Sequence, residues 1–233
     1  MKLSLVIPAY NEGSNIVSLV RGLCKALNYI EDSFEIIMVD DGSTDQTPEI
    51  LAALTKEIAQ LKIVSIFPNQ GYGNAILRGL EVAQGTILGW LSADSQIRPE
   101  DVVVIYRKLA RDGLDLCKGV RIKRNESVFR RIQSAVYNVF FRFLFCVPYR
   151  DINGTPKIFR RSLFESLVLS SKDWFLDPEI MIQSIRKGAK IGEIEVRWRK
   201  RLGGKSKVAY SASLGFIKNM IKYRFFQGGL EDD

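Results

Sequence analysis

Two oxygen-bearing side chains, Asp94 and Gln96, stand two positions apart shortly after the apolar run ILGWL. A carboxylate and an amide carbonyl are oxygen ligands, which suit a hard cation such as Mg²⁺ or Mn²⁺. Such ions keep several waters and complete their coordination with substrate phosphates. The chain has no histidine, so the commonest general base is missing. The pattern therefore predicts a divalent-metal site that works together with a phosphorylated substrate.

Three polar segments each follow an apolar run that we interpret as a buried strand: Pro8–Glu12, Asp40–Ser43 and Ser92–Gln96. In a parallel sheet, the carboxyl ends of the strands lie at one edge, and ligands bind there. We therefore expect the three segments to form one shared site. Asp41 is placed to accept hydrogen bonds from the base or ribose of a nucleotide.

Strand and helix patterns alternate over the first 115 residues. The strands are expected within 2–10, 34–45, 61–67 and 86–94, and the helices within 14–27, 47–61, 73–84 and 98–113. Thr47 is the expected N-cap of the second helix, with Pro48 at its first position. This alternation predicts an α/β fold with a Rossmann-like, mostly parallel sheet and helices on both faces.

The basic residues are concentrated in the second half of the 233-residue chain. Residues 1–115 contain 10 Lys and Arg against 15 Asp and Glu, whereas residues 116–233 contain 24 against 11. A basic half indicates an anionic partner, such as phosphate, nucleic acid or an acidic membrane surface. The three cysteines have no close spacing, so we interpret them as reduced thiols of a cytosolic protein.

Two amphipathic segments in the basic half, 134–149 and 214–226, have apolar residues at helical spacing. Each could be a core helix, but together they indicate helices that lie on a membrane surface. No apolar run reaches the roughly 18 residues that a spanning helix needs. We therefore expect peripheral membrane attachment.

Nine short motifs carry a resemblance to a known family. VIPAYNE (6–12), VDDGSTDQT (39–47), NQGYGNAILRG (69–79) and SADSQ (92–96) resemble the ordered motifs of family 2 inverting glycosyltransferases of the GT-A fold. GVR (119–121), RRIQS (130–134), RDINGTPKIFRR (150–161), FLDPEI (175–180) and RLGGKSKV (201–208) are similar to those of the dolichyl-phosphate mannose synthase and polyprenyl-phosphate glycosyltransferase branch. The match covers most of residues 3–210.

The resemblance implies a domain organisation and a role for each matched residue. It implies a GT-A domain in 1–210, with a nucleotide-binding half (1–115) and an acceptor-binding half (116–210), before an amphipathic helix and acidic tail (211–233). The nucleotide sugar would contact Pro8, Tyr10, Glu12, Val39, Asp41, Ser92, Ala93, Asp94 and Gln96. The donor and acceptor phosphates would contact Arg121, Arg130, Arg131, Arg201, Ser206 and Lys207.

The resemblance implies that the catalytic residues are Asp94, Arg121 and Arg201. Asp94 corresponds to the last Asp of the family's Asp-x-Asp motif and would ligate the metal with Gln96. Ser92 stands where the first Asp of that motif usually is, so one anionic ligand is missing.

The expected activity is metal-dependent, inverting transfer of a sugar from a nucleoside diphosphate sugar to a polyprenyl phosphate, at the cytoplasmic face of a membrane. A phosphate monoester is mostly ionised at neutral pH, with a second pKa of about 6. Such an acceptor needs no enzymic base, in agreement with the missing histidine.

Three alternatives remain open from the residues. The acceptor could be a sugar hydroxyl, with Asp177 or Glu179 as the base. Ser92 could mark a relative that binds nucleotide but catalyses weakly. The basic half could belong to a nucleic-acid-binding module, although the chain has no recognisable nucleic-acid motif, so we expect no such partner.

Overall fold

The structure, a computed structural model, describes residues 2–30, 32–122, 128–199, 220–221 and 223–227, and only the backbone of 128–131 and 226–227. Residues 1–125 and 153–204 form one compact unit, and residues 126–152 and 205–233 form a second. The first unit contains the strands β1 (Leu3–Ala9), β2 (Phe34–Asp41), β3 (Leu61–Ile66), β4 (Ile87–Trp90), β5 (Leu116–Ile122), β6 (Lys157–Arg160) and β7 (Ile191–Arg197). Its helices are α1 (Gly13–Leu27), α2 (Thr47–Glu57), α3 (Tyr72–Val82), α4 (Pro99–Arg111), α6 (Arg161–Glu165) and α7 (Leu176–Arg186).

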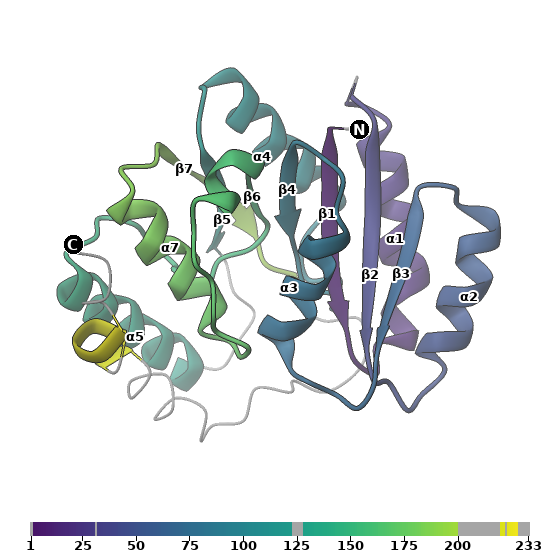
Figure 1. Cartoon of the computed structure of the whole chain (residues 1–233), viewed down its shortest axis with the longest axis horizontal. Coiled ribbons are helices and arrows are strands. Elements are labelled where there is room, and N and C mark those ends of the chain that lie inside the picture. Colours follow the sequence, from purple (N-terminus) through teal and green to yellow (C-terminus); the bar gives the residue numbers. More distant parts are fainter. Residues whose placement is uncertain (1, 31, 123–127, 200–219, 222, 228–233) are drawn as a thin grey trace. The chain divides into compact units, whose positions relative to one another are not determined.

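The seven strands form one mostly parallel sheet in the order β3-β2-β1-β4-β6-β5-β7. β6 runs antiparallel to both of its neighbours, whereas every other pair is parallel. β1 pairs with both β2 and β4, so the ends of these three strands lie next to one another (Figure 1). The predicted α/β fold is confirmed, and it places the three polar strand ends at one edge.

Helices cover both faces of the sheet (Figure 1). α1 packs against α2 and α4 on one face. α3 packs on β1 and β2 from the other face, and α7 reaches that same face at Trp90 and Lys157. These two residues are register partners, so their side chains project from the same side of the sheet.

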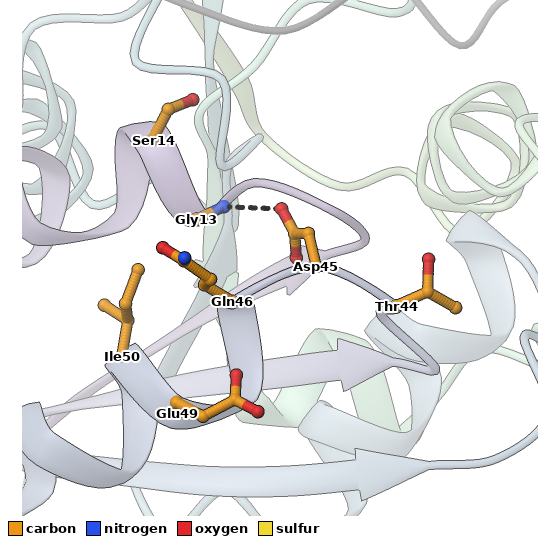
Figure 2. A pocket seen from close by; sticks show the side chains of 7 residues that line it. All are labelled: Gly13, Ser14, Thr44, Asp45, Gln46, Glu49 and Ile50. Carbon is orange, nitrogen blue, oxygen red and sulfur yellow. Dashed lines mark hydrogen bonds between the residues drawn. The ribbon is translucent and has the colours of Figure 1, made fainter.

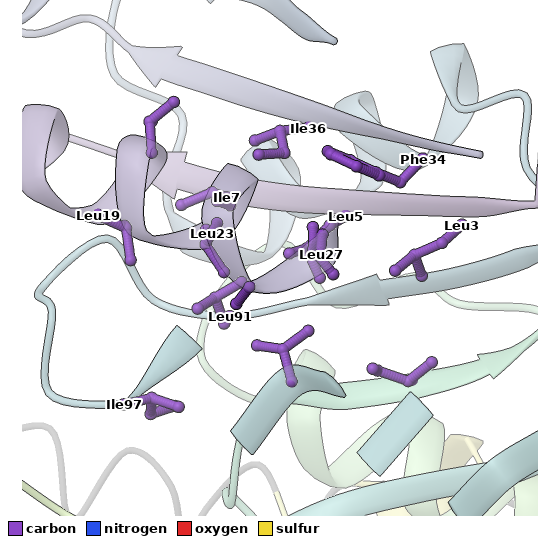
Figure 3. Close-up of a cluster of buried hydrophobic side chains, with 14 of the residues drawn as sticks. Leu3, Leu5, Ile7, Leu19, Leu23, Leu27, Phe34, Ile36, Leu91 and Ile97 are labelled. Carbon is purple, nitrogen blue, oxygen red and sulfur yellow. The ribbon is translucent and has the colours of Figure 1, made fainter. Parts of the chain in front are cut away.

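The core between β1 and α1 follows from the side-chain periods of a strand and of a helix, which place every second and about every fourth residue on one face. Leu3, Leu5 and Ile7 alternate along β1, and α1 presents Leu19, Leu23 and Leu27 at intervals of four (Figure 3). All are between 0% and 3% exposed. This packing fixes the loop that joins β1 to α1, where part of the predicted site lies.

The predicted N-cap role of Thr47 is wrong. α2 begins at Thr47 with proline in its first turn, but its N-cap is Gln46, without a side-chain hydrogen bond. The Thr47 hydroxyl instead accepts a hydrogen bond from the Glu12 backbone N–H at 3.0 Å. The hydroxyl therefore joins the loop after β1 to the start of α2, a contact that local sequence does not reveal.

The second unit contains α5 (Val128–Phe145) and the short π-helix η1 (Tyr223–Gln227). The Asn138 Oδ1 on α5 accepts a hydrogen bond from the backbone N–H of Ile152 at 2.9 Å. Among the helices that the structure describes, none combines the length and apolar character needed to cross a bilayer.

Replacing Gly79 on α3 with alanine is expected to destabilise the protein. The added Cβ would lie 2.4 Å from Val6 Cγ1 and 2.9 Å from Val39 Cγ2 on the sheet. Overpacking of this kind costs about 1–3 kcal/mol, against a gain in helix propensity of about 1 kcal/mol. Urea unfolding of Gly79→Ala and of Gly22→Ala, whose Cβ meets a Pro99 ring carbon at 3.0 Å, should show the larger loss for Gly79→Ala. A Gly79→Ala variant as stable as the parent would contradict this packing.

Candidate functional site

The loops after β1 and β2 are locked together by Asn11. Its backbone φ is 51°, in the left-handed region. Its Oδ1 accepts the backbone N–H groups of Thr44 at 2.7 Å and Asp45 at 3.2 Å, and its own N–H donates to Ser43 Oγ at 2.9 Å. The predicted nucleotide-site residues Tyr10 and Glu12 flank Asn11, so this lock fixes where they lie.

The predicted nucleotide residue Asp41 is buried at the end of β2, with 3% exposure. Its two carboxylate oxygens accept the backbone N–H groups of Gln70 and Gly71, each at 2.8 Å, and its carbonyl accepts Asn69 Nδ2 at 2.8 Å. Gly71 has a φ of 96°, which favours glycine. Asp41 therefore holds the N-terminus of α3 at the site, and its contact with a base or ribose stays a prediction.

The segment after β4 turns sharply around Asp94. The Asp94 Oδ1 accepts the Gln96 backbone N–H at 3.2 Å, and Ser95 between them has a φ of 56°. Asp94, Ser92 and Gln96 are partly exposed, whereas the Ala93 side chain is buried in the core. The turn places the two predicted metal ligands on one short loop at the sheet edge.

The donor set of this loop fits a divalent cation only together with a diphosphate. Among the described residues, no group of three or more Asp, Glu, His or Cys side chains could hold a metal by itself. Gln96 uses Nε2 to donate to the Arg199 carbonyl at 3.0 Å, so Oε1 is its remaining amide atom and has the chemistry of a ligand. Mg²⁺ and Mn²⁺ accept such a sparse set because waters and phosphate oxygens complete their shell.

The same loop is joined to the end of β7. Besides the side-chain bond, the Gln96 carbonyl accepts the Arg199 backbone N–H at 2.9 Å. The preceding residue, Trp198, donates its backbone N–H to the Ile122 carbonyl at 3.1 Å, and the Arg121 guanidinium lies 5.0 Å from its ring centroid. The chain of contacts therefore connects the predicted phosphate residue Arg121 to the predicted metal loop.

A buried ion pair joins Asp177 on α7 to Lys157 on β6, and Trp90 at the end of β4 bonds to the same carboxylate. Asp177 Oδ1 accepts hydrogen bonds from Lys157 Nζ and, at 3.2 Å, from Trp90 Nε1. Lys157 also donates to the Gly154 carbonyl at 3.0 Å, and its ammonium lies 5.8 Å from the Trp90 ring centroid. Lys157 is 0% exposed and Asp177 is 4% exposed. Charges buried to this extent are stable only when they are paired.

Tyr72 lies near both Asp177 and Asp94. Burial raises the pKa of the Tyr72 phenol well above its ordinary value, and the negative charges of Asp177 and Asp94 raise it further. Its ring stacks on Trp174 with centroids 4.1 Å apart. The phenol therefore stays protonated and neutral beside two carboxylates.

Glu179, two residues after Asp177 on α7, has a structural role. It is 0% exposed, and its carboxylate accepts the backbone N–H groups of Ser170 at 3.1 Å and Ser171 at 2.9 Å. Gln183, one turn later, both donates to and accepts from the backbone of Val168. These contacts fasten the segment before α7 to the helix.

The structure leaves some predicted residues without a described position. Arg201, Ser206 and Lys207 lie outside the described residues, as do 214–219 and 222 of the second amphipathic segment. Arg130 and Arg131 lie near the start of α5, and their side chains are not described. Pro8 and Val39 are register partners at the ends of β1 and β2, and their contact with a nucleotide stays a prediction.

A separate depression of about 620 Å³ is lined in part by Thr44 and Asp45 (Figure 2), whose backbone N–H groups donate to Asn11. Gly13, Ser14, Thr44, Asp45, Gln46, Glu49 and Ile50 line it. Two of these residues are acidic and none is basic, so the lining does not suit a diphosphate. None of the predicted site residues lines it.

The sequence did not reveal the residues that hold the site residues in place, above all Trp90, Lys157 and Trp198. Trp90 ends an apolar run and Lys157 lies in a short strand, so each looks ordinary in sequence. Each has its partner far away in the sequence: Trp90 contacts Asp177, 87 positions on, and Lys157 contacts Asp177, 20 positions on. Trp198 contacts Arg121, 77 positions earlier.

The architecture is the GT-A fold of nucleotide-sugar glycosyltransferases. Glucosyl-3-phosphoglycerate synthase from Mycobacterium tuberculosis, crystallised with Mn²⁺, UDP and phosphoglyceric acid, superposes with a TM-score of 0.77 at 19% identity, covering 96% of this chain and 78% of that one. Staphylococcus aureus TarS (residues 1–349), crystallised with UDP-GlcNAc, gives a TM-score of 0.65 at 20% identity, covering 94% and 65%. At these identities the likeness concerns the fold.

The chain belongs to glycosyl transferase family 2, whose model matches residues 4–168. It is 29% identical over 228 residues to the dodecaprenyl-phosphate galacturonate synthase of Rhizobium johnstonii, covering 97% of this chain and 67% of the relative. It is 28% identical over 222 residues to the undecaprenyl-phosphate 4-deoxy-4-formamido-L-arabinose transferase of Salmonella choleraesuis, covering 94% and 66%. The chain thus spans about two thirds of the length of these relatives. The family assignment confirms the resemblance that the motifs carry.

Removing the cation of the buried ion pair is expected to destabilise the fold strongly. Lys157→Met leaves Asp177 as an uncompensated buried charge, which costs about 3–5 kcal/mol in the free energy of unfolding. The double variant Lys157→Met/Asp177→Leu should recover part of this loss because neither charge of the pair remains buried. Arg78→Met, which breaks an ion pair with Glu81 in which both side chains are more than half exposed, should cost no more than about 1 kcal/mol. Urea unfolding decides this, and a double variant no more stable than Lys157→Met would contradict the assignment.

Proposed function

We propose that this protein transfers a sugar from a nucleoside diphosphate sugar to a polyprenyl phosphate, with inversion at the anomeric carbon. The two curated relatives are named for transfer to dodecaprenyl phosphate and undecaprenyl phosphate. The crystallised relatives bind UDP or UDP-GlcNAc, one of them with Mn²⁺. The contacts of the candidate site support the same activity on independent grounds.

The observation that carries the proposal concerns Asp177 and Glu179, the two carboxylates considered as a base for a hydroxyl acceptor. Both are already held by other groups of the protein, in an ion pair or in hydrogen bonds. Asp177 is paired with Lys157, so taking up a proton would break this buried ion pair. Glu179 is fully buried and accepts hydrogen bonds from Ser170 and Ser171. A hydroxyl acceptor needs a base within hydrogen-bond reach. A phosphate monoester does not, because it is already ionised at neutral pH.

In the proposed reaction, an oxygen of the acceptor phosphate attacks the anomeric carbon from the face opposite the diphosphate. A new carbon–oxygen bond forms as the bond to the diphosphate breaks, and the bonding electrons leave with the diphosphate. Asp94 and Gln96 would hold Mg²⁺ or Mn²⁺, which supplies positive charge to the leaving diphosphate. Arg121, joined to this loop through Trp198 and Arg199, would add a second positive charge there.

The direct test is a panel of nucleotide sugars with Mg²⁺ or Mn²⁺ and undecaprenyl phosphate, with the lipid phase assayed for labelled sugar. The proposal predicts metal-dependent label in the lipid phase from at least one donor. Label that appears only in water-soluble products would contradict it.

Asp94→Ala is expected to lower turnover by roughly a hundredfold or more. One electrostatic contact to the charge that develops in the transition state lowers the activation free energy by about 3 kcal/mol. The variant should unfold at the same urea concentration as the parent, since the Asp94 side chain is partly exposed. Turnover is measured at saturating donor and metal. Parental turnover under those conditions would overturn the metal assignment.

The proposal includes peripheral attachment to the cytoplasmic face of a membrane through α5. Ile132, Val136, Val139 and Phe143 follow one another at intervals of four, three and four, which places them on one face of the helix. They are 58%, 61%, 56% and 82% exposed, and Arg142 is exposed beside them. An exposed apolar stripe with a flanking cation suits the boundary between acyl chains and anionic headgroups.

Val136→Glu is expected to reduce sedimentation with liposomes that contain phosphatidylglycerol, because it places a negative charge in the apolar stripe. Val104→Glu is the matched control, since Val104 is 47% exposed on α4 in the other unit. The control should sediment like the parent chain. Equal binding by both variants would rule out α5 as the attachment surface.

A further inference from the structure

A tryptophan supports the arginine that the proposed function assigns to the phosphates. The Arg121 guanidinium carbon lies 5.0 Å from the centroid of the Trp198 ring, within the range of a cation–π interaction. Trp198 directly follows β7, and its backbone N–H donates to the carbonyl of Ile122 on β5 at 3.1 Å. The indole is therefore anchored through its own backbone beside the strand that carries Arg121.

The choice of tryptophan at this position has a cost. Trp198 is 8% exposed, and its indole Nε1 is buried without an acceptor among the described residues. A buried donor without a partner is unfavourable. Phenylalanine or leucine would bury a similar apolar surface without that donor. What tryptophan adds is the most attractive aromatic face for a cation.

The ring is also fixed relative to the predicted metal loop. Arg199, the next residue, donates its backbone N–H to the Gln96 carbonyl at 2.9 Å and accepts Gln96 Nε2 at 3.0 Å. This two-bond connection holds the backbone beside the indole at a set position from Gln96. A guanidinium held against the ring is thereby held at a set position from the loop that would grip the diphosphate.

We propose that Trp198 is a positioning residue that orients the Arg121 guanidinium toward the phosphates of the donor. The inference rests on the proposed function, because Arg121 is the group that would touch the substrate. An arginine held in place before binding loses less side-chain entropy when the anion arrives. Trp198 itself would contact no reacting atom.

The test is site-specific replacement of Trp198 by tryptophans with one to four ring fluorines. Each fluorine weakens the attraction of the ring for a cation and leaves the shape nearly unchanged, so folding is preserved. The dissociation constant of inorganic pyrophosphate in the presence of Mn²⁺ is measured by calorimetry, and KM and kcat for the donor by turnover. We expect a graded weakening of pyrophosphate binding that totals about twofold to thirtyfold.

The same series in an Arg121→Gln background separates positioning from packing. If the ring acts through the arginine, the gradient disappears in that background because no cation remains over the ring. A gradient that persists in Arg121→Gln, or a flat series in the parent chain, would overturn the role of Trp198. A parent chain that neither binds pyrophosphate nor transfers sugar would overturn the proposed function together with this inference.

Discussion

The buried ion pair between Asp177 and Lys157 is the interaction on which the site depends. It joins α7 to the central strands β4 and β6, because Trp90 at the end of β4 donates to the same carboxylate oxygen. The loop that carries Asp94 begins immediately after Trp90, so this ion pair anchors the strand end from which the predicted metal loop departs. Because the carboxylate is committed to Lys157, the same contact also removes a general base from the chemistry.

Around this anchor, the edge of the sheet is built from loops that hold one another. Asn11 locks the loops after β1 and β2, and Asp41 fastens the start of α3 to β2. Gln96 then joins the predicted metal loop to the end of β7. Each contact links segments that are distant in sequence, so the site is set before a substrate binds. A preorganised site spends less binding energy on ordering its own side chains.

The sequence predicted most of the sheet, and the edge at which its polar strand ends meet, because buried strands and amphipathic helices have strong local periods. The three polar strand ends needed only the rule that parallel strands end together. The contacts that support the site could not be predicted, since nothing in the sequence near Lys157 specifies Asp177 as its partner. Thr47 shows the same limit: its position suited an N-cap, but a backbone donor from the loop after β1 takes its hydroxyl. Asp41 was expected to face a nucleotide, and the structure adds a role in holding α3.

The central claim is that the acceptor is a phosphate that is already negatively charged. Asp177 and Glu179 are held by Lys157, Ser170 and Ser171 and do not act as a base. The most direct measurement offers the protein two acceptors of equal chain length, undecaprenyl phosphate and undecaprenol, with the same nucleotide sugar and Mn²⁺. The account predicts that sugar is transferred to the phosphate and that undecaprenol gives no product above background. Comparable transfer to undecaprenol would show that a base operates in the site, and would contradict the account.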